Sequence, residues 1–456
     1  MGERNDTTTF KKKDSWIIRK TMIFKKRTLV VMFTLLVMSL LVSCTTDDAE
    51  NDEVIIDIAC SKTEEDEEDE EDEEDVEEEI EPPEYIIIGG EEFRVTLTTL
   101  NLSRMDLTNE DIEPLRYMVI LRELNLSQNE ISDITPLEYL VNLSELNLNN
   151  NGISDISSLA DLGNLSKLDL GHNQIEDITP LTYLTELTRL CLHNNKVSDI
   201  SPLAGLVNLT RLYVSSNQVR DITALSDLRR LEDLWLQFNQ IDNIEALADL
   251  NRLWRLRLAN NEIIDLTPLV GLTDLRHLEL NQNEIEDVSP LVDLTDLTWL
   301  DLARNQIIDI TPLSNMIDLS LLRLGHNQIY DLTPLENLVN LKDLKLQDNY
   351  IVEITPLANL TSLVHLRLPN NGIIDISPLS GMMELKTLQL QENEVVNLTP
   401  LANLIHLTHL SLWDNRITDV TPLAGLINLE RLVLAGNDIT DLSPLDHLEN
   451  TDIIMY

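Results

Sequence analysis

The chain is poor in cysteine and in basic residues. Its 456 residues include three cysteines, Cys44, Cys60 and Cys191, which lie far apart in the sequence. This spacing is neither that of a disulfide framework nor that of a set of metal ligands. Lysine and arginine number 33 against 80 aspartates and glutamates, so the net charge is −47 at pH 7. Such a chain repels nucleic acid and anionic membrane surfaces over most of its area.

Motifs of catalytic chemistry are also missing from the sequence. There is no nucleophile elbow, phosphate-binding loop, metal-binding motif or pair of carboxylates that stands outside the repeated pattern described next. Acidic residues that recur, such as Asp133 and Asp155, recur throughout that pattern and are interpreted as structural. We therefore expect neither enzyme activity nor a cofactor. Aromatic residues make up 4% of the chain, so the places where they occur are informative.

A repeat of fixed length dominates the chain. The frame is Leu-x-x-Leu-x-Leu-x-x-Asn-x-Ile-x-Asp-Ile-[Ser/Thr]-Pro-Leu, as in residues 121–137, and its asparagine returns every 22 residues, fifteen times. This period is typical of stacked repeat proteins and has the spacing of leucine-rich repeats. The asparagines are Asn129, Asn151, Asn173, Asn195, Asn217, Asn239, Asn261, Asn283, Asn305, Asn327, Asn349, Asn371, Asn393, Asn415 and Asn437.

Each repeat predicts one strand and one short turn. The alternating leucines favour a strand with leucines facing inward. A Thr-Pro or Ser-Pro pair, as at Thr135 and Pro136, indicates a helix start with a hydroxyl N-cap. About six residues remain before the next strand, so a 3₁₀-like turn is expected. We predict a leucine-rich repeat solenoid of about 16 repeats, with a curved parallel sheet on its concave side and short turns on its convex side. The recurring asparagine is expected to satisfy backbone groups in the turn.

Both ends of the solenoid need a cap. Residues 85–120 predict a hairpin, with Gly89 and Gly90 at its turn and its second strand beginning at Phe93, followed by an irregular first repeat. Residues 121–450 hold fifteen regular repeats. Residues 451–456 predict a partial terminal strand, in which Ile454 and Tyr456 should face inward.

The N-terminal segment has the features of an export signal. Lys25-Lys26-Arg27 precedes an apolar run over residues 29–42, which is too short to span a bilayer comfortably, and Leu41-Val42-Ser43-Cys44 follows. This ending resembles the lipobox of bacterial lipoproteins, which implies cleavage before Cys44 and lipidation of its thiol. Residues 1–44 are thus expected to be a lipoprotein signal peptide, with translation beginning at Met22. A signal anchor with an incidental cysteine is the alternative.

Residues 45–84 are expected to form an acidic, disordered tether. Residues 64–75 are all glutamate or aspartate, and four more glutamates extend this run to residue 81. Low hydrophobicity and dense like charge favour an extended chain. Its predicted role is to hold the folded part away from the membrane. A weak cation sink is the alternative.

The full 22-residue unit resembles the internalin type of bacterial leucine-rich repeat over about three quarters of the chain. That resemblance implies a binding protein, since internalin-like proteins bind host receptors. Related repeats in the phosphatase-1 regulatory subunit instead bind an enzyme. The sequence shows no immunoglobulin-like domain after the repeats and no cell-wall sorting signal. The missing domain argues against an invasion role, and the lipobox would supply the anchor.

Candidate ligand-binding residues lie on the concave side of the strands. The middle position between the second and third leucines begins at Asn125 and ends at Val433. Two groups are predicted to contact a ligand, one aromatic and one basic. They are Tyr213, Trp235, Arg257, Trp299 and Trp254, and then Arg323, Lys345 and Arg367. Large aromatics and arginine dominate binding hot spots. An aromatic and cation–π ladder that only stabilises the sheet is the alternative.

The basic group places three like charges on neighbouring strands, which is destabilising. An acidic ligand would relieve this repulsion, and so would Asp301, Asp343 and Asp348 nearby. Histidines on the strands are too far apart for one zinc ion: His365 and His409 are about 10 Å apart by strand spacing. Cys191, at an outward middle position, is a weak candidate for a reactive thiol.

Three functions remain open from the sequence. The favoured one is a lipid-anchored protein on the outer face of a bacterial membrane that binds another protein for adhesion or partner recruitment. The second is an envelope structural protein or a scaffold that holds glycan on the same aromatics. The third is a phosphatase-regulator-like interaction protein, which would require the signal segment to be spurious.

Overall fold

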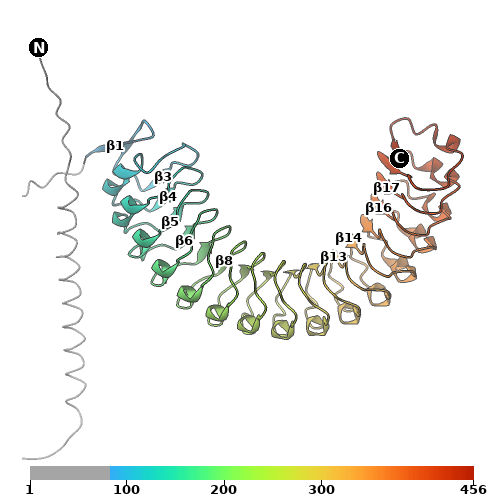
Figure 1. Cartoon of the computed structure of the whole chain (residues 1–456), viewed down its shortest axis with the longest axis horizontal. Coiled ribbons are helices and arrows are strands. Elements are labelled where there is room, and N and C mark those ends of the chain that lie inside the picture. The colour runs from blue at the N-terminus through green and yellow to red at the C-terminus, as the bar shows by residue number, and fades with distance from the viewer. Residues whose placement is uncertain (1–82, 456) are drawn as a thin grey trace, which may run out of the picture. The chain divides into compact units, whose positions relative to one another are not determined.

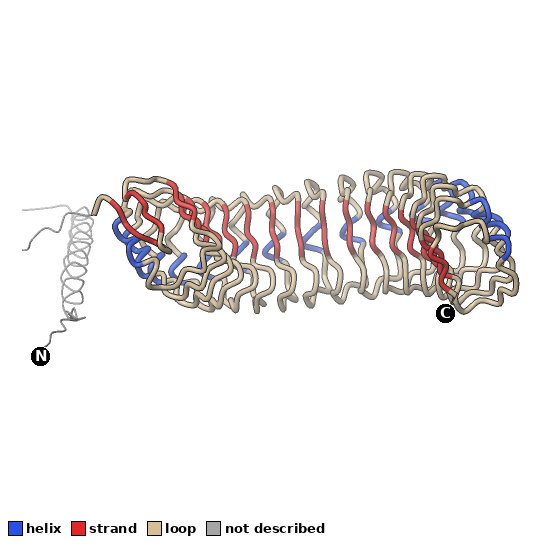
Figure 2. The backbone as a smooth tube through the Cα atoms, turned by 90° about the horizontal axis from the view of Figure 1, so that it is seen from above, coloured by secondary structure: helices blue, strands red, loops and turns tan. Residues whose placement is uncertain are grey.

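The computed structural model describes residues 83–455. They form a solenoid in which each repeat contributes one short strand and one 3₁₀ helix. In Figure 1 the strands line the inner, concave edge of an arc and the 3₁₀ helices lie along its outer edge. Figure 2 shows the strands side by side as the rungs of one long sheet. The predicted leucine-rich repeat solenoid is confirmed.

Seventeen strands, from β3 to β19, make up the parallel sheet. The strands are β3 (Thr99–Asn101), β4 (Glu123–Asn125), β5 (Glu145–Asn147), β6 (Lys167–Asp169), β7 (Arg189–Cys191), β8 (Arg211–Tyr213), β9 (Asp233–Trp235), β10 (Arg255–Arg257), β11 (His277–Glu279), β12 (Trp299–Asp301), β13 (Leu321–Arg323), β14 (Asp343–Lys345), β15 (His365–Arg367), β16 (Thr387–Gln389), β17 (His409–Ser411), β18 (Arg431–Val433) and β19 (Asp452–Ile454). Each strand pairs with the next along the chain, as Leu256 pairs with Leu278. The concave surface is therefore ordered as the sequence is.

Sixteen 3₁₀ helices return the chain to the next strand. They are η1 (Glu113–Tyr117), η2 (Thr135–Tyr139), η3 (Ser157–Leu159), η4 (Thr179–Leu181), η5 (Ser201–Leu203), η6 (Thr223–Leu225), η7 (Glu245–Leu247), η8 (Thr267–Leu269), η9 (Ser289–Leu291), η10 (Thr311–Leu313), η11 (Thr333–Leu335), η12 (Thr355–Asn359), η13 (Ser377–Gly381), η14 (Thr399–Leu401), η15 (Thr421–Gly425) and η16 (Ser443–Leu445). Their short length agrees with the expected six-residue return.

The core is a continuous column of aliphatic side chains. In the repeat of β10, Leu253, Leu256, Leu258, Ile263 and Leu269 are fully buried. The same positions are filled by leucine, isoleucine or valine in the other regular repeats. Full burial of one such side chain contributes roughly 1.5–3 kcal/mol. Because a repeat can bury this face only against its neighbours, the stack is what stabilises each unit.

The recurring asparagine joins neighbouring repeats. The Asn261 side chain is 8% exposed. Its Oδ1 accepts the backbone N–H of Ile241 in the preceding repeat at 3.0 Å. Its Nδ2 donates to the carbonyl oxygens of Leu236 at 3.1 Å and Leu258 at 3.0 Å. One amide thus bonds three backbone groups. The Ile241 N–H would otherwise be buried and unpaired, whereas each carbonyl oxygen also accepts from the asparagine of a neighbouring repeat.

The predicted hydroxyl N-cap of the turns is wrong. At η8 the N-cap residue is Leu266, and it makes no side-chain capping bond. The capping oxygen belongs to the preceding acid, since Asp265 Oδ1 accepts the backbone N–H of Thr267 at 2.8 Å. Asp133 and Asp155 make the same bond to Thr135 and Ser157. The physical reason is that an aspartate carboxylate is long enough to accept the backbone N–H of the residue two positions later. These recurring acids thus have a structural role in the turns.

The N-terminal hairpin closes the first end of the core. Strand β1 (Tyr85–Ile88) pairs antiparallel with β2 (Glu91–Arg94), and Ile86 and Ile88 are buried. Gly89 and Gly90 have φ of 56° and 83°, which a two-residue hairpin turn requires. The second strand begins at Glu91 rather than at Phe93. The irregular first repeat joins the parallel sheet, with Leu100 opposite Leu124.

The predicted register of the last strand is wrong by one residue. Ile453, not Ile454, lies opposite Leu432. Ile453 and Met455 pack against the core, and Ile454 lies opposite Val433 on the concave side. The position that leucine holds in earlier repeats falls on the polar Thr451, so no leucine fixes the 22-residue register here. A one-residue slip moves a strand's side chains to the opposite face.

The expected signal peptide, Cys44 and nearly all of the acidic tether lie outside the described residues. Within residues 83–455 no helix is long and apolar enough to cross a membrane.

Candidate functional site

The middle positions of β8 to β10 bring three predicted site residues into contact. Strand register places Tyr213 beside Trp235 and Trp235 beside Arg257. The Tyr213 and Trp235 rings are 4.4 Å apart between centroids and are tilted by 37°. Arg257 Cζ lies 4.2 Å from the centroid of the Trp235 ring. Such a stack orders large side chains before any ligand arrives.

Tyr213 is too buried to offer much surface to a ligand. It is 9% exposed, and its hydroxyl donates to Asp233 Oδ2 at 3.1 Å. Burial and the neighbouring Asp233 raise the pKa of Tyr213 to about 12. The other oxygen of Asp233 accepts the indole N–H of Trp235 at 2.8 Å. Asp233 therefore fixes both rings, and Trp235, which is half-buried, is the one that reaches the concave surface.

A second aromatic stack lies on β11 to β13. Trp299 stacks on His277 with 4.8 Å between ring centroids, and Arg323 Cζ lies 5.1 Å from the Trp299 centroid. Glu279 links this stack to the first one. Its Oε1 lies 2.7 Å from His277 Nε2 and 3.6 Å from Arg257 Nε. Burial alone would raise the pKa of Glu279, but the His277 bond and the charge of Arg257 bring it below its ordinary value.

These contacts form one continuous cluster over β8–β13. We name as the aromatic row Tyr213, Trp235, Arg257, Glu279, His277, Trp299 and Arg323. Trp254 lies one residue before β10, with Arg255 Cζ 4.3 Å from its ring centroid, and Arg255 Nη1 lies 3.5 Å from Asp233 Oδ2. Trp254 is thus held against the row through Arg255. The cluster is also a cation–π ladder, so stabilisation of the sheet and ligand contact are compatible.

The basic residues of β13 to β15 are neutralised unevenly. Arg323 Nη1 pairs with Asp301 at 3.1 Å and Arg367 Nη1 pairs with Asp343 at 3.0 Å. Lys345 lies between them in register and has no carboxylate within ion-pair distance among the described residues. Burial, together with the charges of Arg323 and Arg367, lowers the pKa of Lys345 below 10.5.

Lys345→Gln is therefore expected to stabilise the fold. Removing a like charge between two strands should raise the free energy of unfolding by about 0.2–1 kcal/mol. Because the folded-state pKa of Lys345 is lowered, its charge opposes folding below that pKa. The gain should therefore shrink as pH rises from the lowered pKa towards 10.5. Urea unfolding at several pH values measures it. Lys167→Gln is the control, since Lys167 pairs with Glu145 at 2.6 Å and should give no gain. Destabilisation by Lys345→Gln would contradict this prediction.

Cys191 is not the exposed thiol that the sequence suggested. It is 2% exposed, and burial followed by the charge of Asp169 raises the pKa of its thiol to about 11. Its outward position is covered because Tyr213 lies beside it on the next strand. The thiol is protonated at neutral pH and unsuited to nucleophilic chemistry. Within residues 83–455, no group of three or more His, Cys, Asp or Glu side chains is arranged to hold a metal ion.

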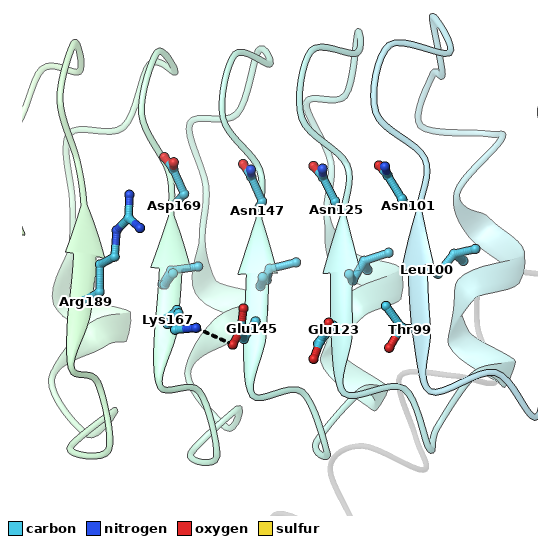
Figure 3. A pocket seen from close by; sticks show the side chains of 13 residues that line it. Thr99, Leu100, Asn101, Glu123, Asn125, Glu145, Asn147, Lys167, Asp169 and Arg189 are labelled. Carbon is cyan, nitrogen blue, oxygen red and sulfur yellow. Dashed lines mark hydrogen bonds and ion pairs between the residues drawn. The ribbon is translucent and has the colours of Figure 1, made fainter.

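Sequence reasoning did not identify a polar hollow at the N-terminal end of the concave face. It has a volume of about 370 Å³. Figure 3 shows one row formed by Asn101, Asn125, Asn147 and Asp169, and a second formed by Thr99, Glu123, Glu145, Lys167 and Arg189. Each asparagine Oδ1 accepts the backbone N–H two residues on. The Nδ2 groups make no bond within the described chain, so they remain available as donors. In the sequence, the asparagines at the middle position of two neighbouring strands, Asn125 and Asn147, could have indicated this hollow.

Comparison with known proteins identifies the repeat class. The family described as leucine-rich repeats (2 copies) matches residues 121–161, 163–205, 207–249, 252–293 and 405–447. An internalin (inlF) from Listeria monocytogenes is 37% identical with a TM-score of 0.64, and the match covers 65% of this chain and 88% of that chain. The comparison with curated proteins gave no match.

Two further structures share the fold at lower identity. A leucine-rich repeat protein of Leptospira interrogans is 24% identical with a TM-score of 0.65, covering 79% of this chain and 90% of that one. The plant peptide hormone receptor RGFR1, solved in complex with RGF2, is 23% identical with a TM-score of 0.69, covering 80% and 63%. Leucine-rich repeat proteins are protein-interaction scaffolds, typically without enzyme activity. The chain belongs to the internalin-type leucine-rich repeat family.

Proposed function

We propose that this protein is a lipid-anchored binding protein that engages another protein through the concave face of its solenoid. The observation that carries the proposal is the aromatic row. It gathers Trp235 and Trp299, both half-buried, on a rigid sheet beside arginines. Tryptophan and arginine in pre-ordered, partly desolvated settings are typical of binding hot spots. The unpaired charge of Lys345 adds a place for a carboxylate of the partner.

The test is capture of a partner by the full-length protein displayed on cells, followed by comparison with the Trp235→Ala/Trp299→Ala double variant. A protein retained by the wild type and lost by the folded double variant supports the proposal. Equal retention by both would remove the aromatic row as the site.

The anchor is proposed at Cys44, placing the solenoid on the outer face of a bacterial membrane beyond the acidic segment. The lipobox-like Leu41-Val42-Ser43-Cys44 supports this. Labelled palmitate is expected to enter the wild-type protein and not Cys44→Ser, and the wild type should fractionate with the membrane. Cys60→Ser is the matched control and should keep the label. No incorporation into the wild type would favour the phosphatase-regulator-like alternative.

A glycan scaffold is the second candidate, and the polar hollow favours it. Donor amides and the carboxylates of Glu123 and Asp169 face the same open space, and sugar hydroxyl groups can bond both types. The two functions differ in their sites. Glycan binding lost in Asn125→Ala/Asn147→Ala but kept in the tryptophan double variant would support this alternative.

A further inference from the structure

One position of the repeat changes character in the C-terminal half. It follows the recurring isoleucine or valine and is polar in most repeats, for example Ser132, Ser154, Ser198 and Thr418. In five consecutive repeats it is large and apolar, and each side chain is between 49% and 63% exposed: Ile308, Tyr330, Val352, Ile374 and Val396. The polar examples show that the fold does not need an apolar residue here. We name these five residues the apolar stripe.

The stripe is continuous because the segments that carry it are joined by backbone hydrogen bonds. The N–H of Tyr350 donates to Ile329 O at 2.9 Å, and that of Gly372 donates to Ile351 O at 2.8 Å. The same bond recurs from Glu394 to Ile373 O at 2.9 Å. Stripe residues of adjacent repeats therefore lie side by side. Tyr350, 67% exposed, widens the stripe next to Val352, where a hollow of about 570 Å³ opens.

Acidic side chains border four of the five stripe residues. Each of four stripe residues is followed directly by an exposed acid: Asp309, Asp331, Glu353 and Asp375. None of these four is within ion-pair distance of a basic side chain in the part of the chain that the structure describes. A second copy of this chain would bring the same acidic border against it, and like charges across an interface are unfavourable. The border instead complements a partner with basic flanks.

The spacing of the stripe suits a helix better than an extended strand. Neighbouring repeats are about 4.8 Å apart at the sheet, while the pitch of an α-helix is about 5.4 Å. A helix laid along the stripe would place one apolar residue of each turn against each repeat, in the i, i+3/i+4, i+7 pattern of helix-in-groove recognition. Residues on one face of an extended strand are about 6.7 Å apart, which does not match the spacing of the repeats. Five repeats correspond to about 18 helical residues.

We propose that the apolar stripe binds an amphipathic helix of another protein, about 18 residues long, whose apolar face is flanked by lysine or arginine. This site lies on the loops after the strands and does not depend on the concave aromatic row. Burial of apolar side chains supplies the attraction, and the acidic border selects the charge of the partner.

The test uses a fluorescein-labelled 18-residue leucine/lysine amphipathic peptide and the full-length protein. Anisotropy is recorded in about 0.3 M salt, where the Debye length of about 6 Å screens general attraction to the acidic chain. The triple variant Tyr330→Ser/Val352→Ser/Ile374→Ser should bind at least about tenfold more weakly at an unchanged melting temperature, because other repeats carry serine at this position. Ile264→Ser is the matched control. It removes an exposed isoleucine from the same repeat position outside the stripe and should leave affinity unchanged.

Three results would overturn the proposal. Equal affinity of the triple variant and the wild type would mean that charge alone attracts the peptide. Equal binding of a leucine/glutamate peptide of the same pattern would remove the role of the acidic border. Dimerisation of the wild type in analytical ultracentrifugation, lost in the triple variant, would assign the stripe to a second copy of this chain.

Discussion

Asn261→Ala is expected to lower the free energy of unfolding by about 2–5 kcal/mol. Truncation leaves the buried Ile241 N–H without an acceptor, which costs about 1–3 kcal/mol. The carbonyl oxygens of Leu236 and Leu258 each lose one bond but keep a second from the asparagine of a neighbouring repeat, so each of these losses costs about 0.5–1.5 kcal/mol. Because each repeat is held only by its neighbours, we expect the loss to loosen the stack at β9–β10 first. Urea unfolding measures the total, and hydrogen exchange locates the weakened repeats.

The control lies in the next repeat, and the opposite test changes Asn261 itself. Asn281→Ala removes a concave amide that makes no hydrogen bond within the described chain, and it should change stability by less than about 0.5 kcal/mol. Asn261→Asp keeps the acceptor for Ile241 but points a second oxygen at two carbonyls. That carboxyl should have a raised pKa in the folded state. Its destabilisation should therefore be present at neutral pH and be relieved as pH falls. Equal stability of Asn261→Ala and wild type would contradict the role of the ladder.

The Trp235→Ala/Trp299→Ala variant is expected to lose about a thousand-fold in affinity for the captured partner. A tryptophan at a hot spot contributes about 2 kcal/mol or more, and 4 kcal/mol corresponds to roughly three decades in Kd. The cost to folding should be smaller, since an exposed cation–π contact is worth about 0.5–1 kcal/mol. Surface plasmon resonance gives the affinity, and circular dichroism reports the fold.

Trp413→Ala provides the matched comparison. Trp413 is half-buried on the concave side, two residues after β17 and away from the aromatic row. We expect the Trp413→Ala variant to bind the partner with the affinity of the wild type. A loss equal to that of the double variant would mean that the ligand site extends over the whole sheet or lies nearer the C-terminal end.

The repeat pattern predicted the strands, the core and the curvature because each leucine occupies an equivalent inward position in every unit of the stack. It failed where the chain departs from the pattern. Thr451 cannot fill a leucine position, so counting in steps of 22 misplaced Ile453 and Ile454. The capping role of Asp265 was missed because aspartate and threonine are both plausible caps, and only the backbone geometry distinguishes them.

The sequence predicted which residues of the candidate site are neighbours, but not how exposed each of their side chains is. Parallel pairing fixed Tyr213, Trp235 and Arg257 side by side. Tyr213 is nonetheless buried, and the bonds that Asp233 makes to both rings have no signature in the repeat pattern. The sequence likewise shows that acidic residues lie near the three basic ones. Only the side-chain positions show that Arg323 and Arg367 form ion pairs with these acids and that Lys345 does not.

The most direct test of the central claim, that a protein binds the concave sheet, is photo-crosslinking on cells. A photoreactive residue replaces Asn281 beside the aromatic row in one sample and the exposed Gly271 after η8 in another. We predict one protein adduct from position 281, suppressed by excess unlabelled wild type, and none from position 271. An adduct from position 271 alone, or none from position 281 while the partner is still retained, would contradict binding through the concave face.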